Sequence, residues 1–234
     1  MVGFDRLLAL ADDALILGHR LSEWTGHAPL LEEELALGNI ALDLIGTARR
    51  LYQYAGEVEG RGRDEDQLAY LRDAPEYKNL LLVEQPNGDF AMTIARQFLY
   101  AAYAAPFWQH ETNSADPTLA DIAKEAARQS AYHLRHAAEW LVRLGDGTEE
   151  SRRRAQSALD ALWMYTGEMF EGPSAVLRAA WDDTVDRTLA RATLARPQSA
   201  YMQSGGRRGR HSEHLGYILA EMQFLQRAYP GMVW

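Results

Sequence analysis

The chain has 234 residues, a formal net charge of −9 and no cysteine, and 47% of its residues are hydrophobic. This apolar content is enough for a core, so the composition excludes a chain that is disordered throughout. The missing cysteines exclude disulfides, thiolate metal sites, iron–sulfur clusters and cysteine nucleophiles. The negative charge opposes binding to nucleic acid or to an anionic membrane surface.

The N-terminal stretch does not have the pattern of a signal peptide. Asp5, Asp12 and Asp13 interrupt its apolar residues, where a signal peptide would have a basic start and an unbroken apolar run. No other run reaches the roughly 18 to 20 apolar residues of a membrane span. We therefore expect a cytoplasmic protein without a membrane partner.

Hydrophobic periodicity predicts helices along nearly the whole chain. Apolar residues at steps of three and four predict helices over about 7–24 and 30–54, and a polar loop follows. Further helices are predicted over about 90–105, 119–144, 149–170, 175–194 and 211–229. Strand-like alternation is not convincing anywhere, so the fold class is all-α. Long amphipathic helices joined by turns favour a ferritin-like four-helix bundle with additional C-terminal helices, as a single domain over 1–234.

A ferritin-like di-iron site can be tested directly by counting. Such a site needs a Glu-x-x-His pair on each of two helices. The residues three positions before the seven histidines are Ile16, Trp24, Phe107, Ser130, His133, Arg208 and His211. None of them is acidic, so the sequence predicts no ordinary di-iron centre and no catalytic residue in this chain.

His133 and His136 are the pair that most suggests a metal. His133 lies on the apolar stripe of its predicted helix and should face inward, while His136 should lie on the flank. Gln129, one turn earlier, is a weak neutral ligand where iron would need a carboxylate. The favoured interpretation is a core histidine bonded to a neighbouring helix, and metal ligation stays open as the alternative.

Arg207, Arg208 and Arg210 precede the last predicted helix. The macrodipole is positive at a helix N-terminus and disfavours cations there, so the cluster predicts contact with an anion, either a phosphate-bearing ligand or an acidic partner surface. A solvated loop after Gly205 and Gly206 is the alternative.

Several long segments carry a resemblance to a known family: "LGHRLSEWTGHAP", "ALGNIALDLIGTAR", "NLLLVEQPNGDFAMTIARQ", "YHLRHAAEWLVRLGDGTEES", "ALWMYTGEMF" and "HSEHLGYILAEMQFLQR". They resemble the C-subunit family of bacterial phenylacetyl-CoA epoxidases, which are multicomponent monooxygenases of aerobic phenylacetate breakdown. The likeness covers almost the whole chain.

The resemblance implies a structural, non-catalytic subunit that pairs with a catalytic A subunit holding the di-iron centre. The heterodimer would belong to a complex with a small B subunit and a reductase, which carries electrons from NADPH through flavin and an iron–sulfur cluster. This chain would bind none of these cofactors.

The resemblance also implies a contact with the coenzyme A end of phenylacetyl-CoA through Glu76, Tyr77, Lys78 and Asn79. Lys78 would meet a phosphate and Tyr77 would stack on adenine, with an ordinary turn as the alternative. The stretch between Phe170 and "LRAAW" is shorter than the family pattern, so no substrate contact is assigned there.

Two other functions stay open. One is an autonomous ferritin-like metal oxidase with the unusual ligands Asp43, Gln129, His133 and His214. The other is a helical scaffold unrelated to oxygenases.

Overall fold

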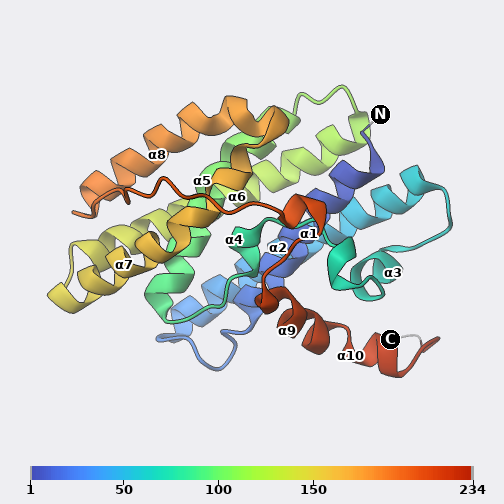
Figure 1. The fold of residues 1–234 in the computed structure, drawn as a ribbon, viewed down its shortest axis with the longest axis horizontal. Coiled ribbons are helices and arrows are strands. Elements are labelled where there is room, and N and C mark those ends of the chain that lie inside the picture. The colour runs from blue at the N-terminus through green and yellow to red at the C-terminus, as the bar shows by residue number, and fades with distance from the viewer. Residues whose placement is uncertain (1, 233–234) are drawn as a thin grey trace. The chain divides into compact units, whose positions relative to one another are not determined.

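A computed structural model of the chain describes residues 2–232, and these residues form helices and turns without strands (Figure 1). The predicted all-α, ferritin-like class is confirmed. The contacts divide the chain into two compact units, one of Met1–Pro86 with Gly205–Trp234 and the other of Asn87–Ser204. The single domain over 1–234 stays a prediction. Among the described helices, none has the length and apolar content needed to cross a membrane.

The first unit is built on two long helices, α1 and α2, to which the C-terminal segment returns. Its helices and 3-10 turns are α1 (Phe4–Ser22), α2 (Leu31–Glu59), α3 (Glu65–Tyr70), η1 (Ala74–Glu76), α4 (Leu81–Glu84), η5 (Gly206–Arg208), α9 (Glu213–Met222) and α10 (Phe224–Ala228). The residues of the predicted apolar stripes on α1 and α2 are buried where the two helices pack. Gly18 lets them approach closely, because a Cβ there would lie 2.9 Å from Ile45 Cγ1.

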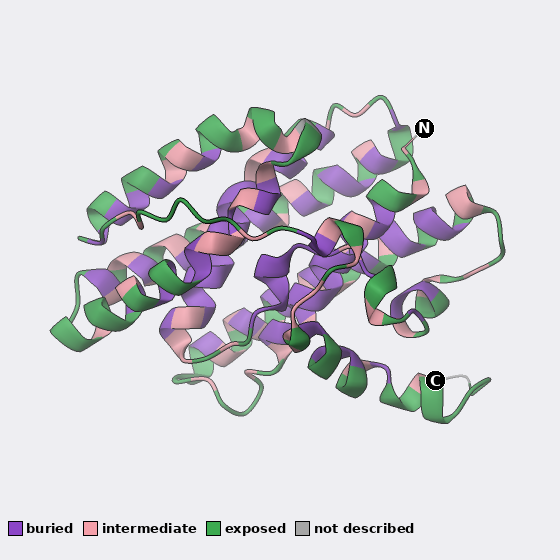
Figure 2. Cartoon of the chain, viewed as in Figure 1, coloured by how far each residue is buried: buried purple, intermediate pink, exposed green. Residues whose placement is uncertain are grey.

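The second unit contains the pair α5 and α6. Its elements are α5 (Phe90–Glu111), α6 (Pro117–Gly145), α7 (Glu149–Leu162), η2 (Trp163–Tyr165), η3 (Gly167–Phe170), η4 (Gly172–Leu177) and α8 (Arg178–Arg191). Figure 2 shows α5 buried along most of its length, whereas α7 and α8 each leave one side exposed. On α6, His133 is buried and His136 is only partly buried, as predicted.

Three predicted element boundaries are wrong. The helix predicted over 149–170 ends at Leu162, and short 3-10 turns follow. There the Thr166 hydroxyl donates to the Trp163 carbonyl at 2.8 Å, a local bond that competes with helix continuation. The last predicted helix breaks at Gln223 into α9 and α10. The polar loop predicted over residues 56–66 is shorter than expected, because α2 continues to Glu59 and α3 begins at Glu65 with a capping box of Asp64 and Gln67.

Candidate functional site

Two segments that were predicted separately lie against each other in the first unit. We call residues 76–80 the anchored segment and residues 206–210 the arginine turn. A Cβ at Gly206 would lie 2.2 Å from the Asn79 carbonyl oxygen, and a Cβ at Gly209 would lie 2.1 Å from the Pro75 carbonyl oxygen. Gly209 also has a φ of +73°, which glycine adopts without steric cost. The predicted coenzyme A segment and the predicted arginine cluster therefore form one site.

Arg207 holds the arginine turn to α1 and to the anchored segment. Its guanidinium donates to Asp13 Oδ2 at 2.7 Å, to the Lys78 carbonyl at 2.8 Å and to the Ala9 carbonyl at 2.9 Å. The anion that Arg207 meets is thus a carboxylate of the chain itself. Arg208 and Arg210 are exposed on the same turn, so these two remain candidates for an external anion.

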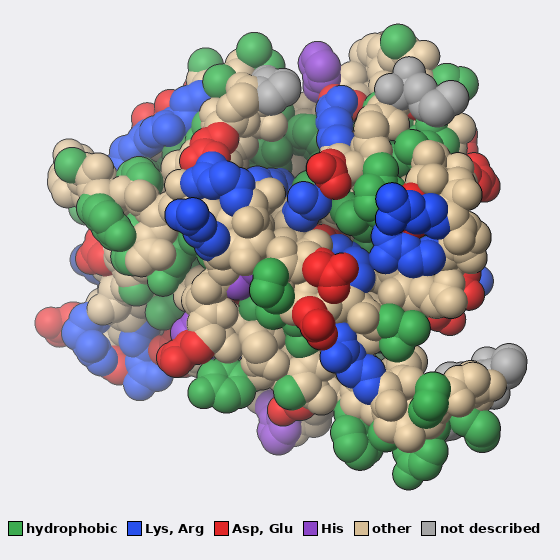
Figure 3. Space-filling view, turned by 45° about the vertical axis from the view of Figure 1, so that its right-hand side comes forward, with side chains coloured by type: hydrophobic (Ala, Val, Ile, Leu, Met, Phe, Trp, Pro, Cys, Tyr) green, Lys and Arg blue, Asp and Glu red, His purple; other side chains and the backbone are tan. Residues whose placement is uncertain are grey.

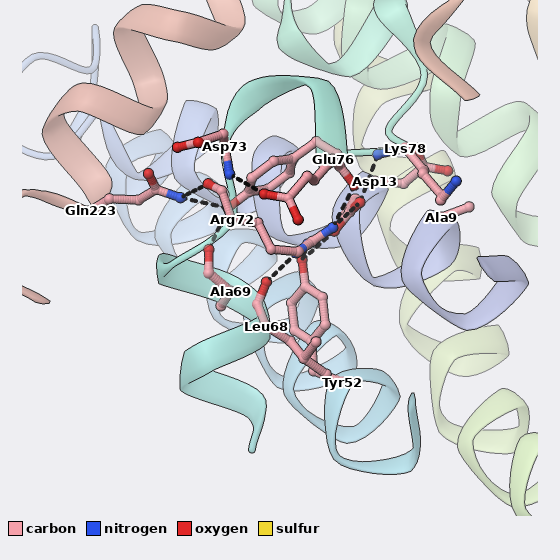
Figure 4. A network of polar contacts seen from close by, with 12 residues as sticks. Ala9, Asp13, Tyr52, Leu68, Ala69, Arg72, Asp73, Glu76, Lys78 and Gln223 are labelled. Atoms are coloured by element: carbon pink, nitrogen blue, oxygen red, sulfur yellow. Dashed lines mark hydrogen bonds and ion pairs between the residues drawn. The ribbon is translucent and has the colours of Figure 1, made fainter. Parts of the chain in front are cut away.

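Asp12 of α1 is the centre of a buried polar network. Its partners Arg72, Tyr52 and Lys78 are drawn in Figure 4. The Asp12 carboxylate accepts two bonds from the Arg72 guanidinium, one bond from the Tyr52 hydroxyl at 2.5 Å and one from the Lys78 backbone N–H at 2.7 Å. The neighbouring Asp13 accepts the Leu80 backbone N–H at 2.7 Å. Two adjacent acids on one turn of α1 therefore fix the backbone of the anchored segment.

A third buried acid, Glu84 of α4, fixes the residues that follow the arginine turn. His211 Nδ1 lies 2.8 Å from Glu84 Oε2, and His211 Nε2 lies 2.9 Å from the Tyr77 carbonyl oxygen. Glu84 also accepts the Ser212 N–H at 2.6 Å and an Asn79 side-chain N–H at 2.9 Å. Because both ring nitrogens of His211 face acceptors, the geometry favours the doubly protonated imidazolium.

The four residues of the predicted coenzyme A contact differ in what they expose. Tyr77 is fully buried: its ring lies 4.2 Å from the Arg72 guanidinium carbon, and its hydroxyl donates to the Ala69 carbonyl. Its predicted stacking on adenine is therefore not possible in this conformation. Asn79 is also fully buried, and Glu76 is exposed but accepts the Asp73 N–H at 2.7 Å as a cap. Lys78 is half-buried, with its Nζ 3.6 Å from Asp5.

Burial and neighbouring charges shift the pKa values of three groups in this site. Burial raises the pKa of Asp13 to about 6, against the opposing effect of Arg207. Burial alone would lower the pKa of the Arg72 guanidinium, but Asp12 and Tyr52 beside it raise that pKa above its usual value. Burial would likewise lower the pKa of His211, whereas its bonds to Glu84 and to the Tyr77 carbonyl raise it overall.

The buried acids of this site are thus neutralised by arginine and histidine side chains of the chain itself. Asp12 faces Arg72, Asp13 faces Arg207, and Glu84 faces His211. Over residues 2–232, no group of three or more His, Asp or Glu side chains is arranged to hold a metal ion. The arrangement fixes a loop rigidly and places Lys78, Arg208 and Arg210 around it.

Sequence reasoning missed the residues that build this site, namely Asp12, Arg72 and Glu84. A signal was present for Asp12 and Asp13, because two adjacent acids stand inside the apolar pattern of the first helix. In the sequence alone, these two acids served only as evidence against a signal peptide. A buried acid on a helix requires a paired cation or a set of hydrogen-bond donors. This requirement would have predicted partners for Asp12 and Asp13 within the chain.

The fold and the site define a ferritin-like helical protein in which the buried acids of the site are paired within the chain. Residues 3–234 match the family described as "Phenylacetic acid catabolic protein", and the chain belongs to this family. It is 46% identical over 241 residues to the C subunit of the 1,2-phenylacetyl-CoA epoxidase of Escherichia coli (strain K12), an alignment that covers 97% of each chain. The resemblance stated from the sequence segments is confirmed.

Proposed function

We propose that this chain is the structural, non-catalytic C subunit of a phenylacetyl-CoA epoxidase. It pairs with the catalytic subunit that holds the di-iron centre and helps to form the acyl-CoA site for phenylacetate catabolism in the cytoplasm. The observation that carries this proposal is the 46% identity to the C subunit of the Escherichia coli epoxidase over 97% of both chains. The complex also contains the B subunit and the reductase with its NADPH, flavin and iron–sulfur cofactors.

The chemistry of the buried acids supports a non-catalytic role. A ferritin-like oxidase uses buried carboxylates as iron ligands. In this chain, Asp12, Asp13 and Glu84 use their oxygens to accept bonds from Arg72, Arg207 and His211 and from backbone N–H groups. These carboxylates serve to position a loop.

The cations around that loop support a contact with coenzyme A. Lys78, Arg208 and Arg210 lie on the anchored segment and the arginine turn, which pack against each other through Gly206 and Gly209. Lysine and arginine are the usual partners of phosphate groups. Asp12 and Asp13 already fix the backbone of the anchored segment. This segment would therefore lose little conformational entropy on binding coenzyme A, which favours affinity. Tyr77 and Asn79 contribute by holding the segment from inside.

Reconstitution with the catalytic subunit tests the proposed function. The purified chain should form a stoichiometric complex with that subunit, and iron should be found in the complex but not in the isolated chain. Failure to form the complex, or stoichiometric iron in the isolated chain, contradicts the proposal.

Variants of the cations test the coenzyme A contact in the assembled complex. Lys78→Ala and the double variant Arg208→Ala/Arg210→Ala should raise KM for phenylacetyl-CoA by roughly tenfold with little change in kcat, since uniform binding energy is lost. Arg187→Ala, which removes an exposed arginine of the other unit, is the matched control. An unchanged KM in both cation variants contradicts the contact.

A further inference from the structure

The C-terminal helices expose large apolar side chains that their own unit leaves uncovered. Figure 3 shows hydrophobic side chains gathered at its lower right, where these helices lie. They belong to α9, α10 and the residue stretch that follows, and their exposed fractions range from 48% to 64%: Tyr217, Phe224, Leu225, Tyr229 and Met232. We call this surface the C-terminal face. Soluble chains rarely expose such a group of large apolar side chains unless it is a binding surface.

Two hollows shape the C-terminal face. The first, of about 480 Å³, has small residues along α9 and α10, namely Gly216, Ala220 and Ala228, with Phe224 beside them. A Cβ at Gly216 would meet nothing within 4 Å, so this part of the groove is open. The second hollow, of about 400 Å³, lies beside Tyr229 and Met232. Small residues between large apolar ones admit the close approach of another helix.

Acidic side chains border both hollows. Asp73 lines the first hollow, and Asp64 and Asp66 line the second. Arg227, the cation in the lining of the first hollow, is paired with Asp73 at 2.9 Å. Asp73 is thereby neutralised, whereas the described lining of the second hollow has Asp64 and Asp66 but no basic side chain. An occupant with basic residues beside its apolar stripe therefore complements the second hollow, whereas a second copy of the chain would place the same acids against one another.

We propose that the C-terminal face docks an amphipathic helix, with lysines or arginines flanking its apolar stripe, from another subunit of the epoxidase. The inference rests on the proposed function, because it takes the occupant to be a subunit of that complex. Aromatic side chains and arginine dominate the energetics of interfaces of this kind.

The C-terminal face is also connected to the anchored segment. Gln223, between α9 and α10, donates to the Arg72 carbonyl and to the Tyr77 hydroxyl, each at 2.9 Å (Figure 4). Arg227 donates to the same Arg72 carbonyl at 2.8 Å. A helix docked on α9 and α10 therefore restrains the bonds that hold Tyr77 and, through it, the segment that carries Lys78.

A leucine in the open groove tests the docking. Gly216→Leu fills the groove from the side where a Cβ meets no atom, and it should weaken assembly with the partner subunits about thirtyfold, the effect of losing one interface hot spot. Gly46→Leu, on an open face of α2, is the matched control and should assemble like the wild type. The helical circular dichroism of both variants checks that they fold. Assembly of Gly216→Leu within twofold of the wild type overturns the inference.

A photo-crosslinking side chain in place of Phe224 identifies the occupant in the reconstituted complex. The expected product joins the chain to a helix of another subunit that carries basic residues beside an apolar stripe. A crosslink to a second copy of the chain, or no crosslink in an assembled complex, overturns the inference. If the wild-type chain binds none of the epoxidase subunits, the proposed function itself is contradicted, so the two failures are distinguishable.

Discussion

Both units bury charged and aromatic side chains, but a network of charges occupies the first unit and a cluster of aromatic rings occupies the second. The first unit buries charges: Asp12 and Arg72 have side-chain exposures of 0% and 3% and bind each other directly. The second unit buries aromatic rings: Trp181 is fully buried, with its ring 5.3 Å from that of Phe170 and 5.5 Å from that of Trp163. One polar bond fixes this tryptophan, from its Nε1 to the Leu99 carbonyl at 3.0 Å.

Several ion pairs of the second unit lie at its surface. Arg191 and Glu139 form one at 2.9 Å with about half of each side chain exposed. Burying a charge costs several kcal/mol of desolvation, which aromatic packing avoids. The first unit accepts this cost where the anchored segment and the arginine turn are held at fixed positions. We infer that directional bonds specify the loop geometry of the site.

The largest expected effect is the loss of Arg72, a buried cation of the first unit. Arg72→Met leaves Asp12 buried without its counter-charge and should lower the free energy of unfolding by about 3 to 5 kcal/mol. Urea unfolding followed by circular dichroism measures it. The double variant Asp12→Asn/Arg72→Met should recover part of the loss, because the uncompensated charge is removed. A loss below about 1 kcal/mol in the single variant would mean that the buried pair stabilises the first unit no more than a surface ion pair would.

A smaller effect is expected from the aromatic interior of the second unit. Trp181→Phe keeps a ring but leaves the Leu99 carbonyl without its donor and opens a small cavity, so it should cost about 1 to 3 kcal/mol. The same urea titration measures it, and Tyr201→Phe, at a side chain that is 65% exposed, is the control. A cost larger than that of Arg72→Met would reverse the expected order of the two units.

These two variants also test whether residues 1–234 form a single cooperative domain. If they do, Arg72→Met and Trp181→Phe shift the same unfolding transition, observed identically by circular dichroism and tryptophan fluorescence. Two separate transitions, each moved by only one of the variants, would mean that the units unfold independently.

The charged interior should also make stability depend on pH, through His211. The pKa of His211 is raised in the folded chain above its ordinary value of 6.5, so its stabilising contribution is complete below pH 6.5 and is lost as pH rises through the folded pKa. His211→Gln should therefore flatten the fall in melting temperature above pH 6.5, with an effect at neutral pH of about 1 to 2 kcal/mol. Thermal unfolding between pH 6 and 9 measures it. An equally steep fall in the variant contradicts this role of His211.

The helices were predictable from sequence because their signal is local. The apolar stripes of α1, α2 and α6 repeat every three or four residues and are buried as expected. The site was less predictable, because its bonds join distant residues. Arg72 binds Asp12 across 60 positions, and Arg207 binds Asp13 across 194. Spacing could suggest that Arg207 meets an anion, but only the tertiary contacts show that this anion belongs to α1. Tyr77 also has a distant partner, because its hydroxyl accepts a bond from Gln223, 146 positions further along the chain.

The smallest expected effect is that of the surface ion pair. In a double-mutant cycle of Arg191→Ala and Glu139→Ala, the coupling energy should be about 0.2 to 1 kcal/mol, because solvent screens two half-exposed charges. Raising the salt concentration to 1 M should reduce it further, since the Debye length falls to about 3 Å. A coupling above about 2 kcal/mol would show that charge pairs stabilise the second unit as well. A small, salt-sensitive coupling beside a large loss in Arg72→Met means that burial, more than the presence of a pair, decides what a charge contributes in this chain.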